Sequence, residues 1–125
     1  MARKPIHKSL QHPKGIVGLP RHVFVSPAYA DLSLTARCVL DELQNLYMPT
    51  RNGRIGLSIT NACKHMKTSY KPVSSAFHEL EAHGFIECML QYNYSAGITR
   101  EWRLTFQQYN GREPTDEWKA WEPKN

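Results

Sequence analysis

Apolar residues recur at intervals of three and four in three separate stretches of the chain. The first stretch follows Ser33 and predicts a helix over about 34–47, which ends before Pro49. The second follows Ser58 and predicts a shorter helix that reaches Met66. Serine is favoured just before a helix, because its hydroxyl accepts a hydrogen bond from an unpaired amide of the first turn. Each of these two helices therefore has a capping residue at its start.

The third helical stretch follows Ser69, after a turn of three or four residues. Pro72 falls in its first turn, where proline is tolerated because those amides have no partner within the helix. This position argues against one continuous helix over 59–82. Gly84 is placed to end the helix in a left-handed conformation. The apolar stripe of this helix consists of Val73, Ala76, Phe77 and Leu80.

Beyond the third helix the pattern changes to alternation of apolar and polar residues. Residues 86–92 and 102–106 alternate in this way and predict two strands joined by a loop at 93–97. The two strands form a hairpin with one buried face. Tyr92 and Trp102 belong to the apolar set and are expected to pack inside.

Three shorter segments carry weaker patterns. Residues 22–25 are expected to form a short strand or an extended apolar contact before Pro27 interrupts the chain. Residues 54–57 are expected to form a short extended link, and 115–117 to start a single helical turn.

These elements divide the chain into three parts. Residues 1–21 are rich in Lys, His, Pro and Gly and predict a flexible basic arm, because so few apolar groups cannot offset the entropy of ordering. Residues 22–106 contain the predicted core. Residues 107–125 form a polar tail that contains Trp118 and Trp121, which either fold back on the body or dock on another chain.

The formal net charge of +5 is concentrated in the arm. Residues 31–106 hold eight basic against seven acidic side chains, and the tail holds three against four. A polyanion is therefore a plausible partner, although the charge alone does not identify it. The first 30 residues contain no acid, and their basic residues are Arg3, Lys4, Lys8, Lys14 and Arg21.

Other classes of protein find little support in the composition. A chain of 125 residues is the size of one domain, and no apolar run approaches the roughly 20 residues that span a bilayer. The basic start lacks the apolar stretch of a secretory signal, so we expect a cytoplasmic protein without a membrane partner. No nucleophile with a base, paired carboxylates or phosphate-cradling glycine loop is visible, so we expect no enzyme.

The cysteines and histidines do not predict a metal or a cofactor. Cys38, Cys63 and Cys88 include no close pair, and their places in apolar patterns favour reduced thiols packed in the interior. His78 and His83 are five residues apart, which turns them away from each other on a helix.

The predicted order of elements is three helices, the last two joined by a tight turn, followed by a hairpin. This order resembles the winged helix-turn-helix family of bacterial, phage and plasmid regulators and replication proteins. A helix of that family opens after a Leu-Ser pair, and Leu32–Ala36 occupies this role. The resemblance covers about 31–106, with Lys67 where the family usually has glycine and Pro72 where threonine is common. Residues in the register of the family are Ser58, Ile59, Ala62, Ser69, Val73, Ala76, Leu80, Glu81, Gly84 and Ile86.

The resemblance implies an α+β fold, with a three-helix core and a C-terminal β-hairpin wing. It also implies that the third helix enters the major groove of DNA, where base edges present hydrogen-bond acceptors. The side of this helix opposite its apolar stripe is rich in donors. It consists of Tyr70, Lys71, Ser74, Ser75 and His78.

Other basic residues around this helix are candidates for phosphate contacts, which fix the register of a protein on DNA. Arg103 has an alternative interpretation as a cross-strand partner of Glu87. The arm either follows the minor groove or only steers the approach to DNA. The phosphate candidates are Lys64, Lys67, Arg54, Arg100 and Arg103.

The sequence thus predicts a double-stranded DNA-binding protein, either a transcriptional regulator or a replication accessory factor of a phage, plasmid or bacterium. The alternative is a winged helix that serves as a protein-protein interaction module and binds a host or replication factor, through Trp118 and Trp121 or through the third helix itself. A homodimer is also open, because many winged helices bind DNA as dimers.

Overall fold

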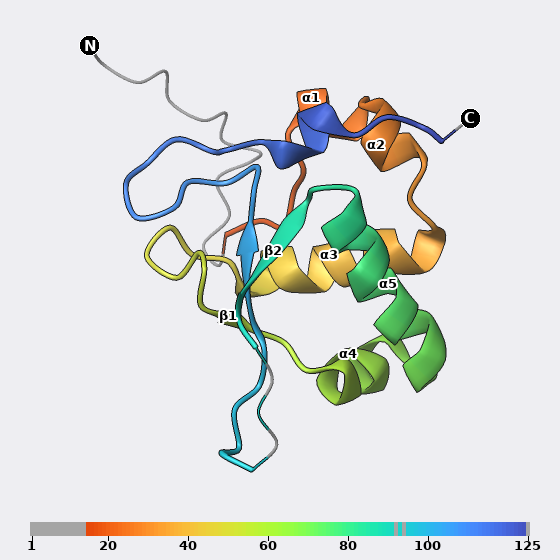
Figure 1. Cartoon of the computed structure of the whole chain (residues 1–125), viewed down its shortest axis with the longest axis vertical. Helices are drawn as coiled ribbons and strands as arrows, with labels where there is room; N and C mark the ends of the chain where they lie inside the picture. The colour runs from red at the N-terminus through yellow and green to blue at the C-terminus, as the bar shows by residue number, and fades with distance from the viewer. Residues whose placement is uncertain (1–14, 92, 94, 125) are drawn as a thin grey trace.

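Two short helices precede the first long helix in the computed structural model, which describes residues 15–91, 93 and 95–124 (Figure 1). Helix α1 spans Arg21–Phe24 and helix α2 spans Pro27–Ala30. Most of the predicted arm, residues 1–14, lies outside the described residues.

The expected strand or extended contact at 22–25 is wrong, because this segment forms α1 and its C-cap. In a strand Val23 and Val25 would share one face, but Val23 is fully buried and Val25 is 69% exposed. Pro27 opens α2 instead of ending a strand, and the Ser26 hydroxyl caps α2 by accepting a hydrogen bond from Tyr29 N. A segment of four residues with valines at 23 and 25 fits either structure, and the burial of Val23 but not Val25 decides for the helix.

The three longer helices lie close to their predicted positions. Helix α3 spans Leu34–Leu46, α4 spans Ile59–Met66 and α5 spans Tyr70–Ala82. The predicted caps are confirmed for the first two, because the hydroxyls of Ser33 and Ser58 accept hydrogen bonds of 3.1 and 3.0 Å from amides of the first turn. The Ser69 side chain makes no such bond before α5.

A small antiparallel sheet completes an α+β fold. Strand β1 spans Ile55–Gly56, β2 spans Ile86–Leu90 and β3 spans Glu101–Leu104, in the order β1-β3-β2. The predicted hairpin is confirmed, and the predicted link at 54–57 contributes the third strand. Tyr92, which was expected to pack inside, lies outside the described residues.

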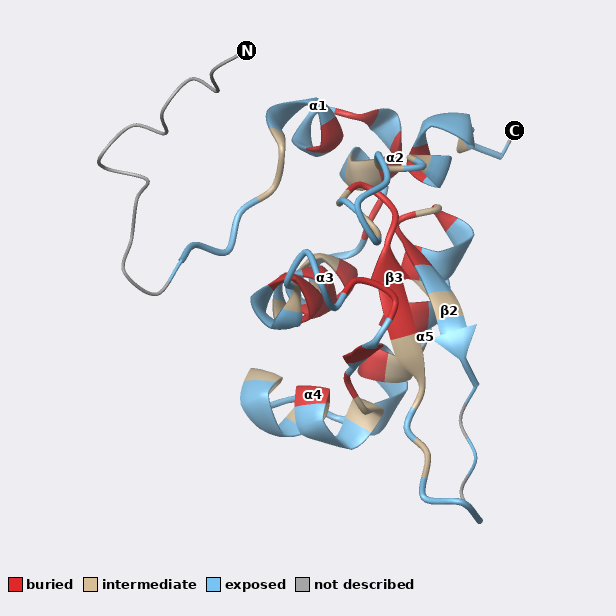
Figure 2. Cartoon of the chain, turned by 90° about the vertical axis from the view of Figure 1, so that its left-hand side faces the viewer, coloured by how far each residue is buried: buried red, intermediate tan, exposed pale blue. Residues whose placement is uncertain are grey.

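The core lies between α3, α5 and the inner face of β3 (Figure 2). The predicted stripe of α5 is buried in it, and Phe77 stacks on the fully buried Trp102 with ring centroids 5.3 Å apart. Cys38 corrects the sequence analysis, because it is exposed on α3 instead of packed inside. Its neighbour Val39 takes the buried position.

The segment after β3 returns to the body. Residues Glu117–Ala120 form the short 3₁₀ helix η2, close to the expected helical turn. Trp118 is 6% exposed and stacks on Phe85, while Trp121 stacks on His83 with ring centroids 4.9 Å apart. The tryptophans therefore fold back on the body, which is the first of the two alternatives.

Candidate nucleic-acid interface

The turn between α4 and α5 is formed by a residue in the left-handed conformation. Lys67 has φ 56° and ψ 49°, and the amide of Thr68 donates to the carbonyl of Cys63 at 3.1 Å. This conformation ends α4 in the way that glycine usually does, at a cost of about 1 kcal/mol for a residue with a Cβ. The lysine side chain stays exposed at the corner between the two helices.

Helix α5 presents a polar side next to this turn. Tyr70, Lys71, Ser75 and His78 are exposed, and Ser74 is half-buried. They lie opposite the stripe that packs into the core, as the helical period requires. Lys64 is also exposed, on the last turn of α4. Lys64, Tyr70 and Lys71 therefore lie beside the α4–α5 corner, and Ser74, Ser75 and His78 follow along the same side of α5.

A groove of about 480 Å³ separates the starts of α4 and α5 from the hairpin. Sequence analysis found Tyr70 and Arg100 but missed the other polar residues of its walls. Nothing in the local pattern marks them, because the groove exists only once the hairpin lies beside the helices. Its lining residues are Leu57, Ser58, Ile59, Thr60, Tyr70, Gln91, Thr99 and Arg100.

Arg100 is held in place by aromatic side chains at the base of the hairpin. Its guanidinium lies 5.2 Å from the ring centroid of Trp102 and 5.9 Å from that of Phe77. These cation–π contacts with two buried rings restrict the guanidinium, which limits the entropy lost when it binds an anion. The residue is half-buried and lines the groove.

Arg103 does not belong to this surface. It is 5% exposed, and its guanidinium donates to Glu87 at 3.3 Å, to Thr115 at 2.8 Å and to Glu117 at 2.9 Å. Three of its five N–H donors are used within the chain, and its burial keeps a phosphate from reaching the other two. The interpretation as a cross-strand partner of Glu87 therefore replaces the predicted phosphate contact.

Arg54 is also separate from the α4–α5 corner. It is exposed and donates to the carbonyl of Thr50 at 3.1 Å, in the loop before β1. Strand β1 leads from this loop to α4, so Arg54 lies at the far end of that strand.

Glu79 links α5 to the start of α3. Its carboxylate accepts hydrogen bonds from the amide of Ser33 at 3.0 Å and from its hydroxyl at 2.6 Å. A carboxylate at the start of a helix is also favoured by the helix dipole. Sequence analysis assigned no role to this acid, because its partner lies 46 residues away.

Burial raises the pKa of several titratable groups among the described residues, which include Tyr29, Tyr47 and Cys88. Burial, followed by the negative charge of Glu81, raises the pKa of Cys88, which keeps this thiol protonated near neutral pH. Within residues 15–91, 93 and 95–124, no three His, Cys, Asp or Glu side chains are arranged to hold a metal ion. In the same residues, no helix is long and apolar enough to cross a membrane.

No known protein family matches the sequence, and comparisons with curated proteins and with solved structures give no match. Evidence on function therefore comes from the geometry of the chain itself.

Proposed function

We propose that the chain is a double-stranded DNA-binding protein of the winged helix-turn-helix class. In this proposal α4 and α5 are the helix-turn-helix, and the β2–β3 hairpin is the wing. The observation that carries it is the exposed polar side of α5, with Lys71 and Ser75 opposite a fully buried stripe. A helix whose outer side carries amine and hydroxyl donors fits the major groove, which presents acceptors on its base edges.

The basic residues around α5 support contacts to phosphates on both sides of the helix. Lys64 and Lys67 lie at the α4–α5 corner, and Arg100 lies across the groove near the start of α5. The hydroxyls of Ser58 and Thr60 are further donors in the groove. We propose that one strand of the duplex follows this groove while α5 reads the bases.

The acids of α5 are compatible with this orientation. Glu79 is bound to Ser33 and so faces α3, and Glu81 follows one half-turn later, away from the start of the helix. The first turn of α5 contains no acid. The end of α5 that would approach the phosphates therefore has little negative charge to repel them.

The protein-interaction alternative receives less support. One of its two surfaces, Trp118 and Trp121, offers no free aromatic anchor, because Trp118 is buried and Trp121 is half-buried against His83. Its other surface, the third helix, is the one assigned here to DNA. We propose a non-enzymatic role, in transcriptional regulation or in replication, that needs no cofactor.

A selection from a random duplex library, followed by fluorescence anisotropy with the recovered duplex, tests the proposal. We expect Lys71→Ala to weaken binding about tenfold, equivalent to about 1.4 kcal/mol for one good contact to a base. We expect log K to fall steeply with log salt, by about 0.9 for each phosphate contact. A recovered palindrome would also reveal a dimer.

Lys124→Ala is the matched control, because it removes one exposed lysine from the C-terminal segment. Its affinity should equal that of the unchanged protein. Equal affinities for Lys71→Ala and Lys124→Ala would reject α5 as the reading helix, and a failure to enrich any duplex would reject DNA as the partner.

A further inference from the structure

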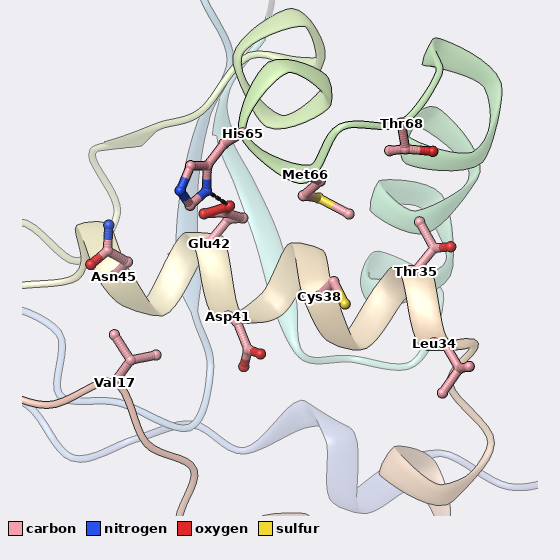
Figure 3. A pocket seen from close by; sticks show the side chains of 10 residues that line it. All are labelled: Val17, Leu34, Thr35, Cys38, Asp41, Glu42, Asn45, His65, Met66 and Thr68. Atoms are coloured by element: carbon pink, nitrogen blue, oxygen red, sulfur yellow. Dashed lines mark hydrogen bonds and ion pairs between the residues drawn. The ribbon is translucent and has the colours of Figure 1, made fainter.

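The outer side of α3 forms the floor of a second groove, of about 700 Å³, which borders the α4–α5 corner but shares no lining residue with the groove beside the hairpin (Figure 3). The end of α4 and the following turn form one wall, and Val17 lies on the opposite side. Apolar side chains contribute to the groove, and Leu34 is 78% exposed. Residues lining the groove are Val17, Leu34, Thr35, Cys38, Asp41, Glu42, Asn45, His65, Met66 and Thr68.

The formal charge of this groove is negative. Asp41 and Glu42 are adjacent on α3, and the described residues that line the groove include no lysine or arginine. Glu42 pairs with His65, whereas none of the ion pairs among the described residues involves Asp41. The Asp41 carboxylate points toward the side on which Val17 lies (Figure 3).

The Asp41 carboxylate would gain from a cation. Partial burial, and then the charge of Glu42, raise the pKa of this group above its ordinary value. Such a shift means that the folded protein disfavours the ionised form, and a nearby positive charge would relieve this.

We propose that the chain's own N-terminal segment, residues 1–14, docks in this groove, with Lys14 against Asp41. The segment carries Arg3, Lys4, Lys8 and Lys14 and no acid, so its charge complements that of the groove. Ile6 and Leu10 lie between the basic residues and match the apolar part of the lining. The docked segment is a contact within one chain and does not depend on DNA binding.

Chain connectivity favours this occupant over any other. Lys14 is three residues from Val17, so their Cα atoms are at most about 11 Å apart. The 14 residues extend to roughly 45 Å, whereas the 13 residues of α3 span about 20 Å. The segment is therefore tethered within about 11 Å of a residue that lines the groove, and its extended length is enough to reach along the whole floor. Being tethered, it has a high effective concentration there.

Amide chemical shifts of the full chain in ¹H–¹⁵N spectra, with a charge swap, test this contact. We expect Lys14→Glu to move the resonances of Thr35, Cys38 and Asn45 at low salt, because the segment leaves the groove. Asp41→Lys should release the segment too, and the double variant Lys14→Glu, Asp41→Lys should restore the position of the segment. In 1 M salt, where the screening length is about 3 Å, the effect of Lys14→Glu should shrink severalfold.

Lys124→Glu is the control for a change of charge in the C-terminal segment, which contributes no residue to the groove lining, and it should leave the groove resonances in place. Asp41→Asn, which only neutralises the exposed carboxylate, repeats the test if Asp41→Lys does not fold. Unmoved groove resonances in Lys14→Glu would overturn the proposal, and so would shifts that depend on protein concentration, because these would indicate the segment of a second copy. Duplex affinity is a separate measurement, so a failure here leaves the proposed DNA binding untouched.

Discussion

The two ends of α5 are built in opposite ways. At its N-terminal end the side chains of Tyr70 and Lys71 are exposed, and Ser69 makes no capping hydrogen bond. At its C-terminal end His83 is buried, with ring nitrogens 2.8 Å from Asp31 and 2.7 Å from the carbonyl of Glu79. Figure 1 shows α4 and the hairpin loop at one end of the molecule and α1, α2 and the C-terminus at the other.

The difference separates residues that hold the fold from residues that are free to bind. Two buried polar groups near the C-terminal end of α5 have partners within the chain, His83 with Asp31 and Arg103 with Glu87 and Glu117. A partnered and buried group cannot bind a ligand without losing those contacts. The N-terminal end keeps its donors in solvent, so a partner can use them at little cost to stability.

Removing the Trp118 side chain, which packs near the C-terminal end of α5, should have the largest effect on the free energy of unfolding. We expect Trp118→Ala to lower the free energy of unfolding by about 4 kcal/mol, because a buried indole that stacks on Phe85 is replaced by a cavity. Urea denaturation measures the change. Trp121→Ala, which removes a half-buried ring, should cost less than half as much.

Duplex affinity of the folded Trp118→Ala protein should stay unchanged, because the substitution lies at the end of the molecule opposite the α4–α5 corner. If stability hardly fell, or if affinity fell as much as stability, the two ends would not be independent.

Substitution of Gly84 should have the next largest effect on the free energy of unfolding. It has φ +82°, and a Cβ at this position would lie 2.7 Å from backbone atoms of Glu117 and Trp118. We expect Gly84→Ala to cost about 3 kcal/mol, from left-handed strain and from the displaced C-terminal segment. Thermal or urea denaturation measures it.

Gly97→Ala is the matched control for Gly84→Ala. Gly97 also has positive φ, at +67°, but no described atom lies within 4 Å of an added Cβ. Gly97→Ala should therefore lower the free energy of unfolding only by the strain of the left-handed conformation, about 1 kcal/mol. Equal losses at the two glycines would mean that the close approach of the C-terminal segment contributes nothing.

Sequence analysis located most elements because their patterns were long. The 13 residues of α5 present a full apolar stripe, and the left-handed Gly84 predicted at its end is confirmed. The segment at 22–25 was too short for its period to separate a helix from a strand. Cys38 was misplaced because it lies beside Val39 and Leu40 on the same helix, and only packing shows which of them face the core.

The candidate site was less predictable than the fold. The exposed side of α5 follows from its buried stripe, so Lys71 and Ser75 could be found from the period alone. Arg100 and Arg103 cannot be distinguished in this way, because both lie on the return side of the hairpin. Thr115 and Glu117, which decide the role of Arg103, come from a segment without strong periodicity.

Substitution of Lys67 should have the smallest effect on stability. It tests the difference between the two ends of α5, because stability and duplex affinity should change in opposite directions. Lys67→Gly removes the strain of φ 56°, so we expect the free energy of unfolding to rise by about 1 kcal/mol. The same change removes an exposed cation from the α4–α5 corner, so duplex affinity should fall severalfold and the salt slope should decrease by about 0.9.

Asn110→Gly is the control, because Asn110 has φ 51° in the turn between Tyr109 and Arg112 and carries no charge. It should raise stability slightly, since asparagine tolerates this conformation better, and leave affinity unchanged. A Lys67→Gly protein that gains stability and keeps full affinity would show that the lysine contacts no phosphate and serves only to end α4.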